Sequence, residues 1–224
     1  MGPPRPAPTV PAAVIDRRLL PVLLLALALP VLAWERARLL EQAVQLPPPA
    51  QRVVQGLVEL IERSPAQAPA QRVREVNDYI NQRVQWQTDQ QIWGQVDYWA
   101  SPLEMFEKGR GDCEDLAMAK YFALLAEGLP ESSLRLVYVR AQYQGRPQAH
   151  MVLAWYPTPQ GEPWILDNID PELKRAGERP DLAPVFSFNA EGLWRGVGAQ
   201  GAGNPLTRLS LWRDALARAK AQGF

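Results

Sequence analysis

The residue pattern changes after Pro130, and this change constrains the fold more than any other feature of the chain. Before it, apolar residues recur with helical spacing, and residues 116–125 are almost wholly apolar apart from Lys120. After it, three short segments rich in Val, Leu, Ile and aromatic residues are separated by turns. These segments are 134–143, 149–156 and 164–169. The pattern predicts an α+β protein in which a buried helix packs on an antiparallel sheet.

Two helix starts are marked in the sequence. Ser101 is a good N-cap, Pro102 suits the first helical position, and Glu104 follows the cap by three residues. Asp112 can cap the next helix in the same way, with Asp115 three residues further on. The second start places a cysteine at the N-terminus of the apolar helix.

The chain has one cysteine, Cys113, and one histidine, His150, among its 224 residues. This excludes an internal disulfide and any zinc site built from several Cys and His ligands. A helix N-terminus favours a thiolate, and the base that activates a thiolate is usually a histidine. Taken alone, a lone cysteine is more often inert and buried, and a lone histidine is more often a satisfied core or surface residue. The two together indicate a nucleophile and its base.

A carboxylate commonly orients such a histidine, and Asp167 on the third predicted strand is the candidate. If the turn at 157–161 joins the second and third strands, a regular hairpin places His150 and Asp167 nearly opposite each other on one face. A bulge would destroy this pairing, and Asp167 could equally end a strand. Cysteine on a helix start, then histidine and aspartate on consecutive strands, is the order that a papain-like or transglutaminase-like core requires.

The N-terminal region predicts an export or anchoring segment. Residues 1–18 form a disordered region that ends in two arginines, and residues 19–34 are uncharged and mostly apolar. The run is short for a membrane span and its cleavage signature is poor, so it is either a signal peptide or a membrane anchor, with a buried core helix as the alternative. Residues 35–50 are expected to form a linker, which the three prolines within 46–50 make stiff, and 51–224 the globular domain.

The charges of the chain balance, with 24 basic and 24 acidic residues. This balance gives no reason to expect binding to nucleic acid or to an anionic membrane surface. The hydrophobic content of 47% suits a packed core.

Several segments resemble the bacterial transglutaminase-like cysteine proteases, and in particular the periplasmic LapG type. They are YWASPLE at 98–104, GRGDCED at 109–115, AKYF at 119–122, QAHMVL at 148–153 and LDN at 166–168. The resemblance extends over roughly residues 73–194. It implies a papain-like or transglutaminase-like core. It also implies an endopeptidase that cleaves a giant surface adhesin near the adhesin's N-terminus, at a di-alanine site, and so releases cells from biofilm.

The resemblance makes Cys113 the nucleophile, His150 the general base and then acid, and Asp167 the orienting carboxylate. It also implies control by an inner-membrane receptor that senses cyclic di-GMP in the cytoplasm. The expected location is the periplasm, with the protein either secreted there or tethered to the inner membrane by residues 19–34.

The resemblance further implies a calcium ion beside the active site, held by Asp112 and Glu114 with Asp115 as a third ligand. Three carboxylates in four residues suit a hard cation. Asp112 and Asp115 are equally good helix-start residues, and the spacing is not that of an EF-hand. Trp99 is expected to line the substrate cleft, although a core position suits a tryptophan just as well.

Two other functions remain compatible with these residues. The same triad serves transglutaminases, which pass the acyl group to an amine instead of water. A catalytically inactive module that binds calcium or an adhesin is the second alternative, although the complete set of Cys, His and Asp argues against it.

Overall fold

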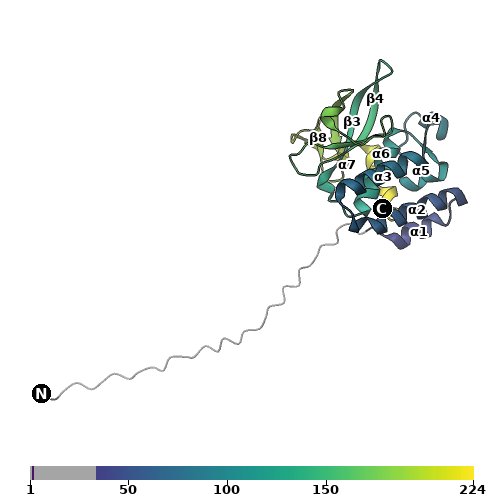
Figure 1. Ribbon diagram of the computed structural model, residues 1–224, viewed down its shortest axis with the longest axis horizontal. Coiled ribbons are helices and arrows are strands. Elements are labelled where there is room, and N and C mark those ends of the chain that lie inside the picture. Colours follow the sequence, from purple (N-terminus) through teal and green to yellow (C-terminus); the bar gives the residue numbers. More distant parts are fainter. Residues whose placement is uncertain (1, 3–33) are drawn as a thin grey trace. The chain divides into compact units, whose positions relative to one another are not determined.

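A seven-stranded antiparallel sheet forms one layer of the structure, in the order β6-β5-β4-β3-β7-β8-β9. The long hairpin of β3 and β4 lies at its centre, and Figure 1 shows this hairpin reaching beyond the helices. The strands of the sheet are β3 (Leu134–Tyr143), β4 (Arg146–Trp155), β5 (Trp164–Leu166), β6 (Lys174–Arg175), β7 (Leu182–Phe188), β8 (Leu193–Arg195) and β9 (Gly201–Gly203). Two short segments, β1 (Gln85–Trp86) and β2 (Arg110–Gly111), pair separately.

Helices cover one face of the sheet. They are α1 (Arg36–Ala43), α2 (Pro48–Arg63), α3 (Pro69–Arg83), α4 (Asp89–Ile92), α5 (Pro102–Lys108), α6 (Cys113–Ala126), α7 (Pro205–Arg208) and α8 (Ser210–Ala221). Short 3-10 turns are η1 (Ser64–Ala66), η2 (Glu131–Ser133) and η3 (Ala176–Glu178). The predicted α+β class, with helices packed on an antiparallel sheet, is confirmed.

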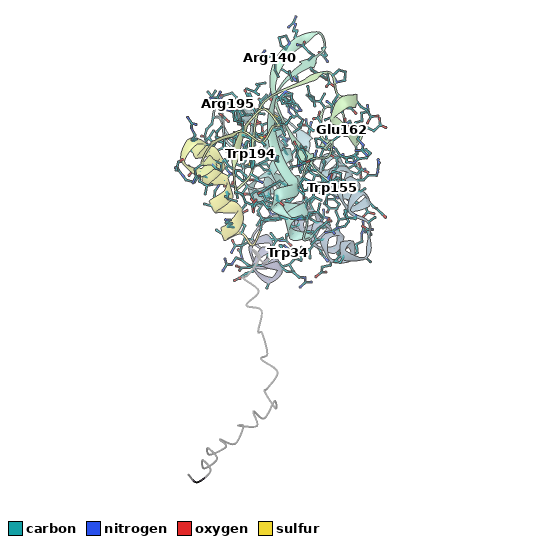
Figure 2. The ribbon with its side chains drawn as sticks, turned by 90° about the vertical axis from the view of Figure 1, so that its left-hand side faces the viewer. Trp34, Arg140, Trp155, Glu162, Trp194 and Arg195 are labelled. Carbon is teal, nitrogen blue, oxygen red and sulfur yellow. The ribbon has the colours of Figure 1, made fainter. Side chains whose placement is uncertain are left out.

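This computed structural model describes Gly2 and residues 34–224. The predicted disordered region 1–18 and the predicted signal or anchor segment 19–34 lie outside the described residues, apart from Gly2 and Trp34. Within the described part of the chain, no helix has both the length and the apolar character needed to cross a membrane. In Figure 2, Arg140 on β3 and Trp34, where the described segment begins, lie at opposite ends of the folded unit.

Helix α6 lies at the centre of the unit, between the sheet and the other helices. It packs against β4 and β3 on one side and against α3 on another. Its residues from Asp115 to Leu124 are all buried, so this part of the helix is enclosed on every side. The near-continuous apolar sequence of this segment follows from that position.

The aromatic core joins α6, the sheet and the C-terminal helix. Trp212 on α8 is fully buried and packs against Tyr121, Phe122 and Phe188, with ring centroids 5.4–5.9 Å apart. Helix α8 is therefore the element that covers the aromatic side of α6.

The expected linker at 35–50 is wrong. Residues 36–43 form α1, whose Leu39 and Ala43 are buried, and α2 begins at Pro48. The prolines that suggested a stiff linker occupy the first turn of α2, where a residue without an N–H costs no hydrogen bond. The Glu35 N–H also donates to the Gly223 carbonyl at 2.9 Å, so the folded unit starts well before residue 51.

The sheet has a second buried face, on the side away from the helices. On β3, side chains alternate, so that Leu136 faces the helices while Val137 and Val139 face away from them. Val137 and Val139 form a small core that Leu182 packs against. Ala176 in η3 and Leu182 at the start of β7 supply this cover from the segment after β6. Strands β6, β8 and β9 are too short to produce a clear alternating pattern in the sequence.

Candidate active site

Cys113 is the first residue of α6, as the sequence predicts. Asp112 is the N-cap, and its N–H donates to the Asp115 carboxylate at 3.4 Å. The matching cap of α5 is also present, because the Ser101 N–H donates to Glu104 at 2.7 Å. The two caps fix where α5 and α6 begin, and so fix the position of Cys113 at the start of α6.

The early end of β5 makes room for the cysteine beside the sheet. β5 pairs with β4 only from Leu153 to Trp155, so the edge of β4 beyond Leu153 has no strand next to it. The Cys113 sulfur lies near the Met151 N–H on this part of β4, and that N–H opposes the rise in the pKa of the thiol.

His150 on β4 and Asp167 just after β5 are hydrogen-bonded, with 2.7 Å between Nε2 and Oδ1, and both side chains are buried. The expected strand register is wrong, however. Leu166 pairs with Leu153, so a continued strand would bring Asp167 opposite Val152. Asp167 reaches His150 because the chain leaves the strand at this point.

Asp167 is held as an ionised carboxylate. Burial alone would raise its pKa, but His150, the Ile169 N–H and the Arg179 guanidinium outweigh burial and hold the pKa of Asp167 well below its usual range. Oδ1 accepts the N–H groups of Asn168 and Ile169 at 2.6 and 3.0 Å, and Oδ2 accepts Arg179 Nη2 at 2.7 Å. The side chain can therefore present only one oxygen to the histidine.

Lys120 contacts the backbone of Asp167. It is fully buried on α6, and its Nζ donates to the Asp167 carbonyl at 3.1 Å. Asn81 on α3 donates to the same carbonyl at 2.7 Å. Burial lowers the pKa of Lys120 to about 7, although the charges of Asp167 and Asp78 oppose this.

Lys120 should give the protein a pH-dependent stability. Between about pH 7 and 10.5 the unfolded chain holds a proton on this amine that the folded chain has lost, so raising the pH through this range stabilises the fold. Over this pH range, the free energy of unfolding of the wild type should therefore rise relative to that of Lys120→Met. Urea unfolding at several pH values measures both. Lys220→Met on α8, at an exposed position, is the matched control and should follow the wild type. If the free energies of unfolding of the wild type and Lys120→Met change with pH in the same way, the lowered pKa of Lys120 is contradicted.

A cluster of carboxylates lies immediately beside the cysteine. Among the described residues, several overlapping groups each place their possible ligand atoms within 4.8 Å of one another. The members are Asp89, Asp97, Asp112, Glu114 and Asp115. Asp89 and Asp97 come from residues 85–100, before α5, and were not among the predicted ligands. The available signal was that these two carboxylates are the only charged residues of that segment.

The cluster suits a hard cation. Burial is the main cause that raises the pKa of Asp89 to about 6 and that of Asp112 to about 10, and the charge of Glu114 adds to both shifts. Among the described residues, one oxygen of Asp89 and one of Asp112 are buried without a hydrogen-bond partner. Unpaired buried oxygens in a group of repelling carboxylates are the donor set that calcium prefers. Asp115 is engaged differently, because its Oδ1 accepts the Ala100 N–H at 2.7 Å.

The thiol of Cys113 interacts with the same cluster. Its sulfur donates to Glu114 Oε2 at 2.8 Å. Burial, and then the charges of Glu114 and Asp112, raise the pKa of Cys113 well above its usual value. The lowering expected from the helix N-terminus is therefore outweighed by burial of the thiol and by the carboxylates that flank it.

Cys113 and His150 open into one cavity of about 310 Å³, which is also lined by Trp86 and Tyr143. Trp86 is 55% exposed, so an aromatic side chain is available to a bound ligand. Trp99, the residue expected to line the cleft, lies elsewhere. It is almost fully buried and stacks on Phe188, with ring centroids 5.9 Å apart. The sequence could not separate the two tryptophans, because burial depends on contacts made across the fold.

A sequence profile described as bacterial transglutaminase-like cysteine proteinase BTLCP matches residues 58–180, more than half of the chain. The chain belongs to this family. The matched range contains Cys113, His150 and Asp167.

Solved structures of LapG from Legionella pneumophila are similar to this family member over most of its length. One is 36% identical, with a TM-score of 0.72, and covers 84% of this chain and 98% of the other. An EGTA-treated form is 35% identical over the same shares, with a TM-score of 0.74. A calcium-bound form is 37% identical, with a TM-score of 0.70, over 81% of this chain and 97% of the other. No curated protein sequence matches the chain.

Proposed function

We propose that this member of the cysteine proteinase family is a calcium-dependent endopeptidase with Cys113 as nucleophile, His150 as base and acid, and Asp167 as the carboxylate that orients His150. The observation that carries this proposal is the joint geometry of the three residues. Cys113 and His150 line one cavity, and His150 bonds to Asp167 at 2.7 Å. Because Nε2 of the imidazole is engaged by Asp167, Nδ1 remains to exchange a proton with the thiol and the substrate.

The reaction proceeds by acyl transfer. The Cys113 sulfur, having given its proton to His150, attacks the peptide carbonyl and forms a carbon–sulfur bond. The Cys113 N–H lies in the first turn of α6, where no helical carbonyl accepts it, and it stabilises the oxyanion. His150 then donates its proton to the departing amine as the carbon–nitrogen bond breaks. A water molecule gives a proton to His150 and attacks the thioester. The carbon–sulfur bond then breaks, the acid leaves, and His150 returns its proton to the sulfur.

We further propose that the carboxylate cluster binds calcium. A cation held by Asp89, Asp97, Asp112 and Glu114 supplies positive charge that offsets the carboxylates which raise the pKa of the thiol. Two observations support this site in the chain itself: the unpaired buried oxygens of Asp89 and Asp112, and the close approach of the carboxylates. The calcium-bound and EGTA-treated forms of the similar Legionella protein agree with a calcium site in this fold.

The substrate that we propose is a large repeat-containing surface adhesin, cut near its N-terminus in the periplasm, so that cells leave a biofilm. The support is the resemblance of the site segments to LapG-type proteases, together with the uncharged apolar run at 19–34 that suits export or tethering to the inner membrane. By the same resemblance, an inner-membrane receptor that senses cyclic di-GMP controls the enzyme.

The test is to incubate the purified protein with N-terminal segments of candidate adhesins and to identify the fragments by mass spectrometry. Cleavage at one bond by the wild type supports the endopeptidase. A labelled primary amine in the same mixture separates the alternatives, because its incorporation without cleavage would instead identify a transglutaminase. Neither product, together with a Cys113 thiol that iodoacetamide does not label, would identify an inactive binding module.

Calcium removal should stop the reaction without moving the cleavage site. EGTA is expected to abolish cleavage, and added calcium should restore it at the same bond. Calcium should also raise the melting temperature, since a ligand at a hundred times its Kd stabilises the folded state by about 2.7 kcal/mol. Asp89→Asn should weaken calcium binding in a calorimetric titration, whereas Asp214→Asn at a surface ion pair on α8 should not. Full activity in EGTA would overturn the calcium proposal alone.

A further inference from the structure

Arg179 is the charged group that completes the site, and neither the sequence pattern nor the resemblance pointed to it. We propose that Arg179 is a positioning residue for the reaction: it holds the Asp167 carboxylate in the one orientation that serves His150. The inference rests on the proposed function, because it assigns a role within the same triad. It is carried by the buried contact between the two side chains.

The two oxygens of Asp167 have separate partners. Oδ1 accepts His150 at 2.7 Å, and Oδ2 accepts Arg179 Nη2 at the same distance. Asp167 and Arg179 are both buried, with 1% and 4% of their surface exposed. Without the guanidinium, Oδ2 would be a buried anionic oxygen with no hydrogen bond from the described residues. The carboxylate would then gain by rotating away from His150 or by taking up a proton.

Arg179 is itself fixed from the other side. Its Nε donates to Asp181 Oδ1 at 3.0 Å and its Nη2 to Asp181 Oδ2 at 2.7 Å. The guanidinium therefore binds the Asp181 carboxylate by two hydrogen bonds while it also donates to Asp167. The chain segment between η3 and β7 carries both Arg179 and Asp181. This segment therefore connects the second face of the sheet to the triad.

The charge of Arg179 also changes the net charge that lies next to the His150 imidazole. A carboxylate paired with a guanidinium presents a weaker net charge than an isolated carboxylate, because the guanidinium offsets it. The hydrogen bond to Asp167 then serves to orient the imidazole of His150. Lysine cannot reproduce this, because a single ammonium cannot bond Asp167 and grip Asp181 with two bonds at once.

The competing explanation is purely structural. Arg179 would then only tie the η3–β7 segment to the sheet. Its loss would lower the stability, but the folded fraction would keep normal turnover. The two explanations differ in kcat and in the reactivity of the thiol, measured on protein that is folded.

The experiment compares Arg179→Gln, Arg179→Lys and Arg179→Ala with the wild type and with Arg175→Ala. Arg175 is the matched control, because it lies on neighbouring β6, stacks on Trp164 and has no bond to Asp167. We measure kcat and KM for the cleaved peptide and, without any substrate, the rate at which iodoacetamide labels Cys113. Circular dichroism and a melting curve confirm that each variant is folded at the assay temperature.

Arg179→Gln is expected to lose about 10²-fold in kcat with little change in KM, and to label more slowly. Arg179→Lys should recover part of the loss. In Arg179→Ala, added guanidinium should restore part of the activity, because a cavity of about 160 Å³ lined by Val152 and Ile165 adjoins the vacated position. Arg175→Ala should behave as the wild type.

Wild-type kcat and labelling in folded Arg179→Gln would overturn the inference, as would a loss seen only in KM. If the Arg179 variants do not fold, Asp181→Asn loosens the guanidinium at a half-buried position without removing it. A fall in kcat and in labelling supports the inference, and unchanged values overturn it. The labelling rate separates this outcome from failure of the proposed function, because it tests the role of Arg179 even if no adhesin segment is cut.

Discussion

Replacement of Cys113 by alanine is expected to abolish cleavage, with a fall in kcat of at least about 10⁴-fold. The chain has no other thiol, so no second nucleophile of this kind can take over. The alanine side chain removes only the sulfur and its hydrogen bond to Glu114. The measurement is turnover of the adhesin segment, with mass spectrometry to show that iodoacetamide adds one label to the wild type and none to the variant.

Two controls separate the loss of the nucleophile from other effects. Calcium binding by Cys113→Ala should persist, because calcium prefers the oxygen ligands that remain. Gln148→Ala, which changes another residue that lines the cavity, should retain measurable turnover. If Cys113→Ala cleaves the substrate at a rate near that of the wild type, the enzyme does not use this cysteine and the triad assignment fails.

Replacement of Trp212 by alanine is expected to cost about 3–5 kcal/mol of unfolding free energy. The indole is fully buried and contacts Tyr121 and Phe122 on α6 and Phe188 on β7, so its loss opens a cavity between three elements. The neighbours are themselves large rings held by other contacts, and they cannot collapse to fill the space. Urea unfolding followed by tyrosine fluorescence or circular dichroism gives the value.

The matched control for Trp212 is Trp86→Ala. Trp86 is the same residue type, but it is 55% exposed, so its removal should change the unfolding free energy by no more than about 0.5 kcal/mol. A change below about 1 kcal/mol in Trp212→Ala would mean that α8 does not close the core in solution. Turnover measured on the folded fraction should survive the Trp212 change, because this residue does not line the catalytic cavity.

The helix starts and the strands of the central hairpin were predictable from the sequence. Ser101 with Glu104, and Asp112 with Asp115, are caps whose donors and acceptors lie three residues apart, so their geometry is local. The apolar run after Asp115 predicted a buried helix for the same reason, since the period of side chains is a property of the helix itself. The prolines at the start of α2 misled the prediction of a linker, because proline is compatible with both an extended segment and a first helical turn.

The arrangement of the site residues was predictable only in part. His150 and Asp167 are bonded, as expected, but through a strand that ends early and not through the paired register that the turn position suggested. Trp99 was expected in the cleft and is in the core, whereas Trp86 lines the cavity. The residues next to a tryptophan in the sequence do not indicate whether distant side chains will bury it.

The sequence by itself determined the two capped helix starts, the central hairpin, the α+β class and the identity of the one thiol and one imidazole that a cysteine protease in this chain can use. The tertiary structure alone decided what surrounds them: Asp89 and Asp97 beside Cys113, and Arg179 against the second oxygen of Asp167. The physical reason is the range of the interactions. Periodicity and capping act over three or four residues, whereas a buried carboxylate is paired by whichever distant side chain the packing of the sheet brings within 3 Å.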